Sequence, residues 1–155
     1  MRGTNTEKKY TRIAPGTNNE YYGFVLDTNP ESDTLYVFEA PIDLMSHCTI
    51  ADIKSKEQGS WKAQNRIALL GVNDHALKCY LSKHSNIKTL KFCLDNDEAG
   101  RTATQKYMKE YYEKGYRTES ITYKSPGKDI NEILCNYYEK RKPKAKAPPI
   151  ANKGM

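Results

Sequence analysis

Hydrophobic residues occur in short runs that alternate with amphipathic segments along most of the chain. Four runs rich in strand-forming residues follow one another: "LYVFEA" (35–40), "RIALLG" (66–71), "TLKFCLD" (89–95) and "RTESITY" (117–123). After each comes a segment with apolar residues at helical spacing: "PIDLMSHCTIADI" (41–53), "NDHALKCYLSKH" (73–84), "DEAGRTATQKYMKEYYEKG" (97–115) and "KDINEILCNYYEK" (128–140). This alternation predicts an α/β fold with a mostly parallel four-stranded sheet flanked by helices. A shorter run, "YYGFVL" (21–26), predicts a short N-terminal strand that extends the sheet.

Turn-forming residues and helix faces support this arrangement. Pro41 suits the first turn of a helix, where its missing N–H is not needed. Gly71 gives the chain freedom to turn after the second strand, and Gly115 is placed to end the third helix. Four apolar residues of the second helix fall on one face, which predicts its buried side: Ala76, Leu77, Tyr80 and Leu81.

The charge of the chain is concentrated at its C-terminal end. A length of 155 residues is enough for one domain with its own core. We expect a flexible N-terminal segment over residues 1–19, the folded domain over 20–139, and a basic, disordered tail over 140–155. The six basic residues of the tail equal the whole net charge of +6, so residues 1–139 are formally neutral. The tail is either an inert solvated end or a phosphate-binding arm.

Membrane and secreted proteins are disfavoured. No run approaches the ~18 apolar residues of a membrane span, and "MRGTNTEKKY" has no apolar stretch of the kind found in a secretory signal. We therefore expect a cytoplasmic protein without a membrane partner.

The cysteines, histidines and tyrosines suggest structural roles. The cysteines stand far apart inside apolar patterns with no C-x-x-C pair, which argues against a zinc knuckle and favours buried, reduced thiols: Cys48, Cys79, Cys93 and Cys135. The histidines have no convincing partner in the sequence and are expected to be structural or exposed: His47, His75 and His84. The tyrosines of "KYMKEYYEKGY" are spaced like a helix packing surface, so none is assigned as a nucleophile.

Two carboxylates stand where a site is expected in a parallel sheet. Glu39 ends the first predicted strand and Asp95 ends the third, and sites in such sheets form at the carboxyl ends of strands. A carboxylate at the end of a buried strand is costly to desolvate unless a cation meets it. Asp97 follows after one intervening residue, and two such acids can both present oxygens to Mg²⁺, which takes few protein ligands and keeps several waters.

Asp97 also has a plainer interpretation. An aspartate just before a helix is a common N-cap, and Glu98 in the first turn suits the helix dipole. Arg101, four residues after Asp97, could form an exposed salt bridge with it. The D-x-D pair alone is therefore weak evidence for a metal site.

Further acidic residues strengthen the metal hypothesis. Asp43 lies one helical turn after Glu39 in "FEAPID", so both side chains can face the same crevice. The motif "GKDINE" opens the last predicted helix with Lys128, Asp129, Asn131 and Glu132.

In this order, "YVFEAPIDLMS", "ALLGV", "FCLDNDEAGRTAT" and "GKDINEIL" resemble the Toprim domain. This module occurs in bacterial primases, type IA and type II topoisomerases, OLD-type nucleases and RecR-like repair proteins. The resemblance covers roughly residues 20–140 and is greatest to the primase-like Toprim proteins of plasmids and conjugative elements. It implies a Toprim (Rossmann-like) fold.

The resemblance also implies roles for particular residues. Glu39 corresponds to the family's glutamate, a general acid or base and sometimes a metal ligand. Asp95 and Asp97 correspond to its Mg²⁺-binding aspartates and complete the implied catalytic set. Asp43 and Asp129 match further acidic positions, which adds them to the implied ligands of Mg²⁺ or Mn²⁺.

Three other positions are affected by the resemblance. Asn131 stands where primases tend to carry another aspartate, a departure that removes charge from a second metal site. Arg101 and Lys128 gain an interpretation as nucleic-acid phosphate contacts. The alternative, that both are ordinary residues at the starts of helices, stays open.

The implied function is Mg²⁺-dependent phosphodiester chemistry on DNA, single-stranded DNA included, or on RNA. This would make the protein a primase-like nucleotidyltransferase or a nuclease of mobile-element DNA processing and replication. The alternative is a non-catalytic, RecR-like accessory module that binds DNA or metal, and a formally neutral body favours it. A phosphate-binding or nucleotide-binding regulatory domain would fit the sheet but leaves the acids unexplained.

Other domains are expected to act beside this one. Primases of this kind use a zinc-binding module and a basic N-terminal subdomain, and topoisomerases use a separate tyrosine-bearing domain. The sequence contains neither, so we expect a C-terminal piece of a larger mobile-element protein or a stand-alone small Toprim protein. Its expected partner is a zinc-binding domain or a helicase or relaxase domain.

Overall fold

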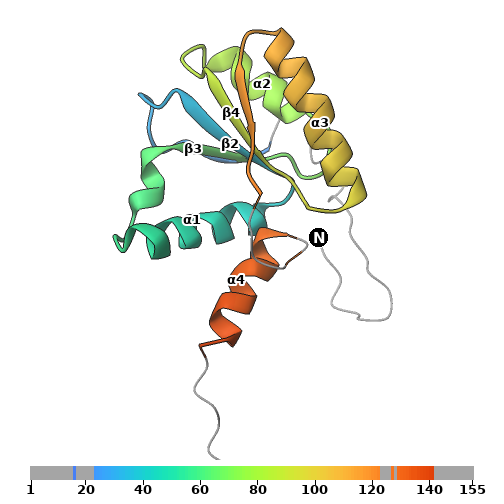
Figure 1. The fold of residues 1–155 in the computed structure, drawn as a ribbon. Coiled ribbons are helices and arrows are strands. Elements are labelled where there is room, and N and C mark those ends of the chain that lie inside the picture. Colours follow the sequence, from blue (N-terminus) through green and yellow to red (C-terminus); the bar gives the residue numbers. More distant parts are fainter. Residues whose placement is uncertain (1–15, 17–22, 123–126, 128, 142–155) are drawn as a thin grey trace, which may run out of the picture.

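The computed structural model describes residue 16, residues 23–122, residue 127 and residues 129–141. These residues form a sheet with helices on both sides (Figure 1). In chain order the elements are β1 (Phe24–Leu26), β2 (Thr34–Phe38), α1 (Pro41–Ser55), the 3-10 helix η1 (Ser60–Ala63), β3 (Asn65–Ala68), α2 (His75–Lys83), β4 (Thr89–Cys93), α3 (Glu98–Glu113), β5 (Arg117–Ser120) and α4 (Ile130–Glu139).

The sheet has the strand order β1-β3-β2-β4-β5. The pairs β3–β2, β2–β4 and β4–β5 are parallel, and β1 pairs antiparallel with β3 at one edge. The prediction of four mostly parallel strands with a short N-terminal extension is therefore confirmed. The central strands β2 and β4 bring their carboxyl ends to the same edge, because Phe38 is in register with Cys93.

Alternate residues of β2 point into two separate hydrophobic clusters. Leu35 and Val37 belong to the cluster that includes residues of α2 and α3, whereas Tyr36 and Phe38 belong to the one that includes residues of α1 and α4. Figure 1 shows α1 and α4 below the sheet and the other two helices at its top and right. Both faces of the sheet are therefore covered, which explains the nearly continuous apolar strands.

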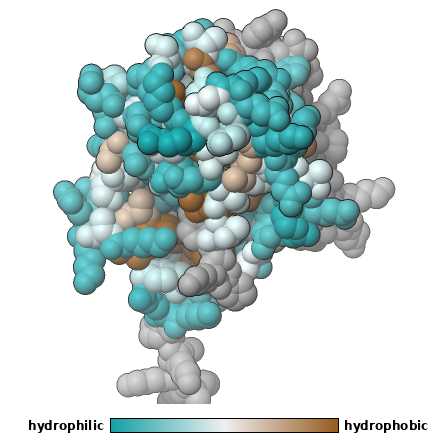
Figure 2. Space-filling model, turned by 45° about the horizontal axis from the view of Figure 1, so that its top comes forward, coloured by the Kyte–Doolittle hydropathy of each residue, from teal (hydrophilic) through white to brown (hydrophobic). Residues whose placement is uncertain are grey.

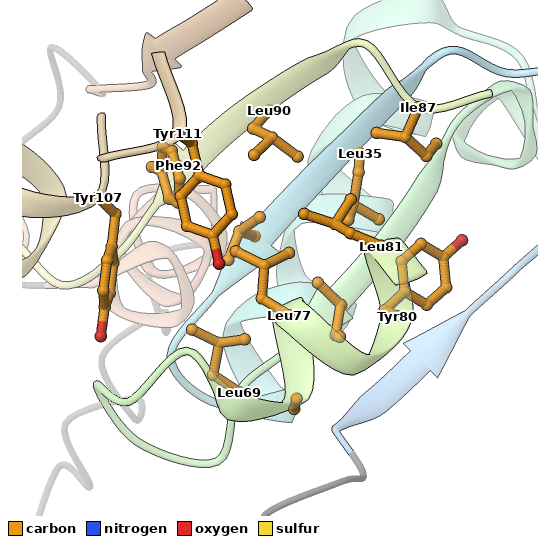
Figure 3. Close-up of a cluster of buried hydrophobic side chains, with 13 residues drawn as sticks. Leu35, Leu69, Leu77, Tyr80, Leu81, Ile87, Leu90, Phe92, Tyr107 and Tyr111 are labelled. Atoms are coloured by element: carbon orange, nitrogen blue, oxygen red, sulfur yellow. The ribbon is translucent and has the colours of Figure 1, made fainter. Parts of the chain in front are cut away.

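The larger cluster is built partly from the tyrosines of α3 (Figure 3). Tyr107 and Tyr111 are 4% and 1% exposed, and their rings lie 6.1 and 6.2 Å from the ring of Phe92. The interpretation of these tyrosines as a packing surface is correct. Tyr112 lies on the other side of the helix and is 71% exposed.

The predicted helix boundaries are close to the observed ones. Pro41 is the first residue of α1. Gly71 has φ +145° and Gly115 has φ +91°, backbone conformations that favour glycine. The Gly115 N–H donates to the Tyr112 carbonyl at 2.9 Å, which closes the end of α3. All four residues of the predicted apolar face of α2 are buried.

The predictions for two cysteines and for one short helix were wrong, and those for the two ends of the chain concern residues that the structure does not describe. Cys48 and Cys93 are buried and all four thiols are free, but Cys135 is exposed on α4 and Cys79 is half-buried, because both fall toward the solvent side of their helices. The helix η1 was not predicted, since a single turn has little periodicity. Residues 1–15 and 142–155, which include most of the two expected flexible segments, lie outside the described residues.

The surface is largely polar. On the face shown in Figure 2, hydrophilic residues dominate and hydrophobic ones are visible only in small groups. Among the described helices, none combines the length and the hydrophobicity that crossing a bilayer requires.

Candidate functional site

The predicted acids lie at the carboxyl edge of the sheet. Glu39 follows β2 directly, and Asp95 follows the adjacent parallel strand β4 after one intervening residue. Both residues are half-buried. The two strands thus deliver a glutamate and an aspartate to the same edge, as the sequence pattern predicted.

Asp43 links this edge to helix α4. It is only 4% exposed, and its Oδ1 accepts a hydrogen bond from the Asn131 N–H at 3.0 Å. Asp129 is the N-cap of α4, with its Oδ1 accepting from the Glu132 N–H at 2.7 Å. Two aspartates from different helices therefore satisfy two of the free N–H groups at the start of α4.

The carboxylates of this group repel one another. The pKa of Asp43 is raised from its ordinary value of 3.8 to about 6, chiefly by burial and further by the negative charges of Asp129 and Asp95. The Asn131 N–H opposes this rise but does not cancel it. Among the described residues, neither Asp43 nor Asp129 forms an ion pair with a lysine, arginine or histidine. Asp43 thus lies within electrostatic reach of two other aspartates.

A cavity of about 320 Å³ opens beside the acids, between α3, β5 and the start of α4. Asp95 and Asp129 line it together with Arg101, whose Nη1 donates to the Asn96 carbonyl at 2.7 Å. Its other lining residues are apolar or uncharged: Phe92, Leu94, Asn96, Thr104, Gln105, Met108, Ser120, Ile121, Thr122, Gly127, Ile130 and Ile133. The cavity combines two acids, one cation and an apolar floor.

Asp97 is separated from this cavity. Its Oδ1 accepts from the Gly100 N–H at 2.9 Å, so the prediction that it caps α3 is correct. It lines an open surface groove with Val72, Glu98 and Tyr107 instead. The two aspartates of the D-x-D motif therefore border different hollows, on either side of the start of α3.

Gly100 lies tightly against the backbone of Asp95. A Cβ at Gly100 would stand 2.1 Å from the Asp95 carbonyl oxygen, far inside van der Waals contact. The helix and the strand-to-helix turn thus approach each other closely through their backbones at this position. This contact fixes the start of α3 against the turn that connects it to β4.

We expect Gly100→Ala to destabilise the protein by about 1–3 kcal/mol, because the added methyl group forces Asp95 or α3 to move. Alanine has the higher helix propensity, so propensity alone predicts the opposite sign. Urea unfolding measures the change. Thr102→Ala, on an exposed position of the same helix, should leave stability nearly unchanged. Equal or higher stability of Gly100→Ala would contradict this packing.

The loop after β3 lies beside Glu39 and is anchored by the core tyrosines. The Gly71 N–H donates to the Glu39 carbonyl at 3.1 Å. Tyr107 donates its hydroxyl hydrogen to the Val72 carbonyl, and the Tyr111 hydroxyl donates to Asp74 Oδ2 at 3.0 Å. The buried face of α3 thereby fixes the backbone next to the glutamate.

The side chains at this edge suit a hard cation, although they do not form a ready-made cage. In the described part of the chain, no three histidine, cysteine, aspartate or glutamate side chains are grouped as a metal cluster. Mg²⁺ needs only one or two carboxylates and keeps several waters. The oxygen donors and the accumulated negative charge at Asp43, Asp95 and Asp129 fit such an ion.

Other residues of the site were missed or fall outside the structure. The sequence analysis did not single out the uncharged polar side chains of the cavity: Asn96, Thr104, Gln105, Ser120 and Thr122. Asn96 lies inside the D-x-D motif, which was the available signal for it. Lys128, predicted to contact phosphate, lies outside the described residues.

Comparisons with known proteins agree with this geometry. The family model described as Toprim-like matches residues 36–134, which include β3, β4, β5 and the last three residues of β2. The chain belongs to the Toprim-like family. The expected Toprim fold is thereby confirmed, and its central strands are those that carry Glu39 and Asp95.

One solved structure similar to this Toprim-like chain is the primase fragment of the bacteriophage T7 primase-helicase protein. The two share 16% sequence identity with a TM-score of 0.46, over 69% of this chain and 41% of that one. The chain thus spans less than half the length of that fragment. No curated protein matches the chain.

Proposed function

We propose that this Toprim-like domain carries out Mg²⁺-dependent phosphodiester chemistry on nucleic acid, as a primase-like nucleotidyltransferase or a nuclease. The observation that carries the proposal is the electrostatic coupling of Asp43 to Asp129 and Asp95, since the pKa of Asp43 is raised chiefly by burial and further by these two negative charges. Phosphoryl transfer requires charge neutralisation and positioning more than covalent help from the protein. An acidic group beside a cavity with one arginine meets these requirements.

The residues take different roles in this proposal. Asp95, with Asp129 and Asp43 beside it, would hold Mg²⁺ or Mn²⁺, which neutralises phosphate charge when bound. Arg101 lines the same cavity and has N–H donors beyond its bond to Asn96, so it can contact a phosphate oxygen. Glu39, on the neighbouring strand, acts as general acid or base. Asp97 borders the groove on the other side of α3, where it would provide a carboxylate ligand to a metal ion that reaches this groove.

The biological setting is also part of the proposal. We place the protein in mobile-element DNA processing in the cytoplasm, with single-stranded DNA, DNA or RNA as its partner. Residues 20–139 would form the catalytic domain, residues 1–19 a flexible segment and residues 140–155 a basic arm. A zinc-binding domain or a helicase or relaxase domain would supply the nucleic-acid affinity that a neutral body lacks.

A non-catalytic, RecR-like accessory module is the second candidate. One observation favours it: residues 1–139 carry no net charge. Such a module would bind metal or DNA without turnover. The two candidates share the metal site and differ in whether Glu39 transfers a proton.

The metal site is tested by thermal unfolding with and without Mg²⁺ or Mn²⁺. A cation that relieves the repulsion should stabilise the protein by about 1.4 kcal/mol when present at about tenfold its Kd. Asp95→Asn should remove most of this gain. Glu31→Gln, an exposed acid on the loop before β2, is the matched control and should retain the gain. Coincident unfolding midpoints with and without metal in the wild type would exclude a metal site.

A further inference from the structure

A second pocket lies along helix α1, from His47, one turn after Asp43, to Lys54 near the end of the helix. This cavity of about 220 Å³ is enclosed by the C-terminal half of α1, by η1 and by strands β2 and β3. Its lining residues are aromatic, cationic or small: Tyr36, His47, Ile50, Ala51, Lys54, Ser60, Trp61, Ala63, Gln64 and Arg66. Along the helix, Lys54 is roughly 16 Å from Asp43 at 1.5 Å per residue. The two cavities share no lining residue, so the pocket is distinct from the acidic cavity.

Arg66 forms the interior of this pocket. Its side chain is part of a residue only 2% exposed, and its Nη1 donates to the carbonyls of Trp61 and Gln64. The guanidinium carbon lies 5.3 Å from the centre of the Tyr36 ring and 5.9 Å from that of Trp61. A buried cation thus holds two aromatic rings in place beside the cavity.

His47 contributes a neutral ring to the same wall. Its Nδ1 accepts from Arg66 Nε at 3.2 Å, and its ring centre lies 4.7 Å from that of Tyr36. The pKa of His47 is lowered to about 3, first by burial and then by the positive charges of Arg66 and Lys54. The two charged groups that act on the His47 ring, Arg66 and Lys54, are thus both cations.

The rim of the pocket is also basic. Lys54 is exposed in the last turn of α1, and the ammonium group of Lys62 lies 5.9 Å from the centre of the Trp61 ring. Asp52, two residues before Lys54, is ionised and accepts from local donors: Gly59 N–H at 2.9 Å, Ser60 Oγ at 2.9 Å and Trp61 N–H at 3.3 Å. The pocket lining itself contains Lys54 and Arg66 and no acid, so cations outnumber acids at the cavity.

We propose that this pocket binds single-stranded nucleic acid, with one base against the rings of Tyr36 and Trp61 and the adjoining phosphates on Lys54 and Lys62. Aromatic rings interleaved with cations are the common means of binding single strands without sequence preference. The cavity is smaller than the roughly 300–1,000 Å³ of whole-ligand pockets, so it suits a single base rather than a complete nucleotide. The inference rests on the proposed function, since it names where the nucleic-acid substrate is held.

The single tryptophan of the chain makes this proposal directly testable. Titration of the full chain with oligothymidylate should quench Trp61 fluorescence in a saturable way. In parallel, fluorescence anisotropy of a labelled oligothymidylate gives the affinity. Tyr36→Leu should weaken binding about tenfold through loss of stacking. The double variant Lys54→Gln/Lys62→Gln, at two exposed positions, should reduce the slope of log K against log salt by about 1.4.

Matched variants on other helices distinguish binding at this pocket from non-specific binding of the oligonucleotide elsewhere on the protein. Tyr112→Leu and the double variant Lys83→Gln/Lys109→Gln change exposed residues of α2 and α3 and should bind as the wild type does. The proposal is overturned if oligothymidylate leaves Trp61 unquenched, if both pocket variants bind normally, or if inorganic phosphate displaces the oligonucleotide at equal concentration. The metal-dependent shift in unfolding, abolished by Asp95→Asn, is measured separately, so a failure of the acidic site is distinguishable from a failure of this pocket.

Discussion

Asp43→Asn is expected to stabilise the metal-free protein at pH 7 by up to about 3 kcal/mol. The pKa of Asp43 is raised to about 6 from 3.8, and each unit of difference between the folded and unfolded states corresponds to about 1.4 kcal/mol. The ionised carboxylate is therefore held in the folded protein at a cost. Asparagine removes the charge, and its carbonyl oxygen can still accept the Asn131 N–H.

The gain should depend on pH in a definite direction. Below about pH 4, the Asp43 carboxyl is protonated in both states, so the charge contributes no difference. Between about pH 4 and pH 6, the folded protein retains a proton that the unfolded chain has lost, so wild-type stability falls as pH rises. Above about pH 6 the cost is complete and constant. The advantage of Asp43→Asn should grow through this window and then level off.

Urea unfolding at several pH values, in EDTA, measures this effect. Asp52→Asn is the control on the same helix with the opposite sign, because the Gly59 N–H and neighbouring donors hold the pKa of Asp52 below its ordinary value. Its loss should destabilise the protein near neutral pH. Saturating Mg²⁺ should reduce the difference in unfolding free energy between the wild type and Asp43→Asn, since the cation offsets the repulsion. A variant less stable than the wild type at pH 7 would show that the cap on α4 outweighs the charge.

The sheet could be predicted because each central strand is covered on both faces. In β2, Leu35 and Val37 face one cluster and Phe38 the other, so the strand is apolar throughout and stands out from the amphipathic helices. The single turn of η1 has no such signal. The exposure of Cys135 was missed because an apolar pattern on α4 does not say which side another helix covers.

The acidic site could be predicted in outline because strand ends fix the places of Glu39 and Asp95. The bond between Asp43 and the Asn131 N–H joins residues 88 positions apart, and no local pattern encodes it. The separation of Asp97 from Asp95 also depends on how tightly Gly100 lies against the turn. The spacing of residues along the sequence does not determine such close contacts in the folded protein.

The basic pocket on α1 was not predicted at all. Its members come from β2, α1, η1 and β3, and each alone reads as an ordinary strand or helix residue. Arg66 falls in an apolar strand, and His47, expected to be structural or exposed without a partner, is buried and accepts a hydrogen bond from Arg66. Only the tertiary structure shows that the two groups share one wall with Tyr36 and Trp61.

Glu39→Gln is expected to abolish turnover while the fold and most of the metal affinity remain. The isosteric amide fits the end of β2 but cannot exchange a proton, and a positioned acid or base contributes about a hundredfold to ten-thousandfold in rate. The assay is a Mn²⁺-containing reaction of the full chain with single-stranded DNA, and separately with nucleoside triphosphates. Unfolding with and without metal, on the same preparations, reports fold and metal affinity.

Two further variants distinguish loss of proton transfer at Glu39 from loss of metal binding. Glu98→Gln makes the same chemical change at an exposed residue in the first turn of α3, so its turnover should equal that of the wild type. Asp97→Asn keeps an N-cap at α3, because asparagine also accepts from the Gly100 N–H. If Asp97 is a ligand, this variant should lose metal-dependent stabilisation along with turnover, whereas Glu39→Gln should lose turnover alone. Should the wild type bind DNA without any turnover, and bind it equally well after Glu39→Gln, the domain is the accessory module and Glu39 transfers no proton.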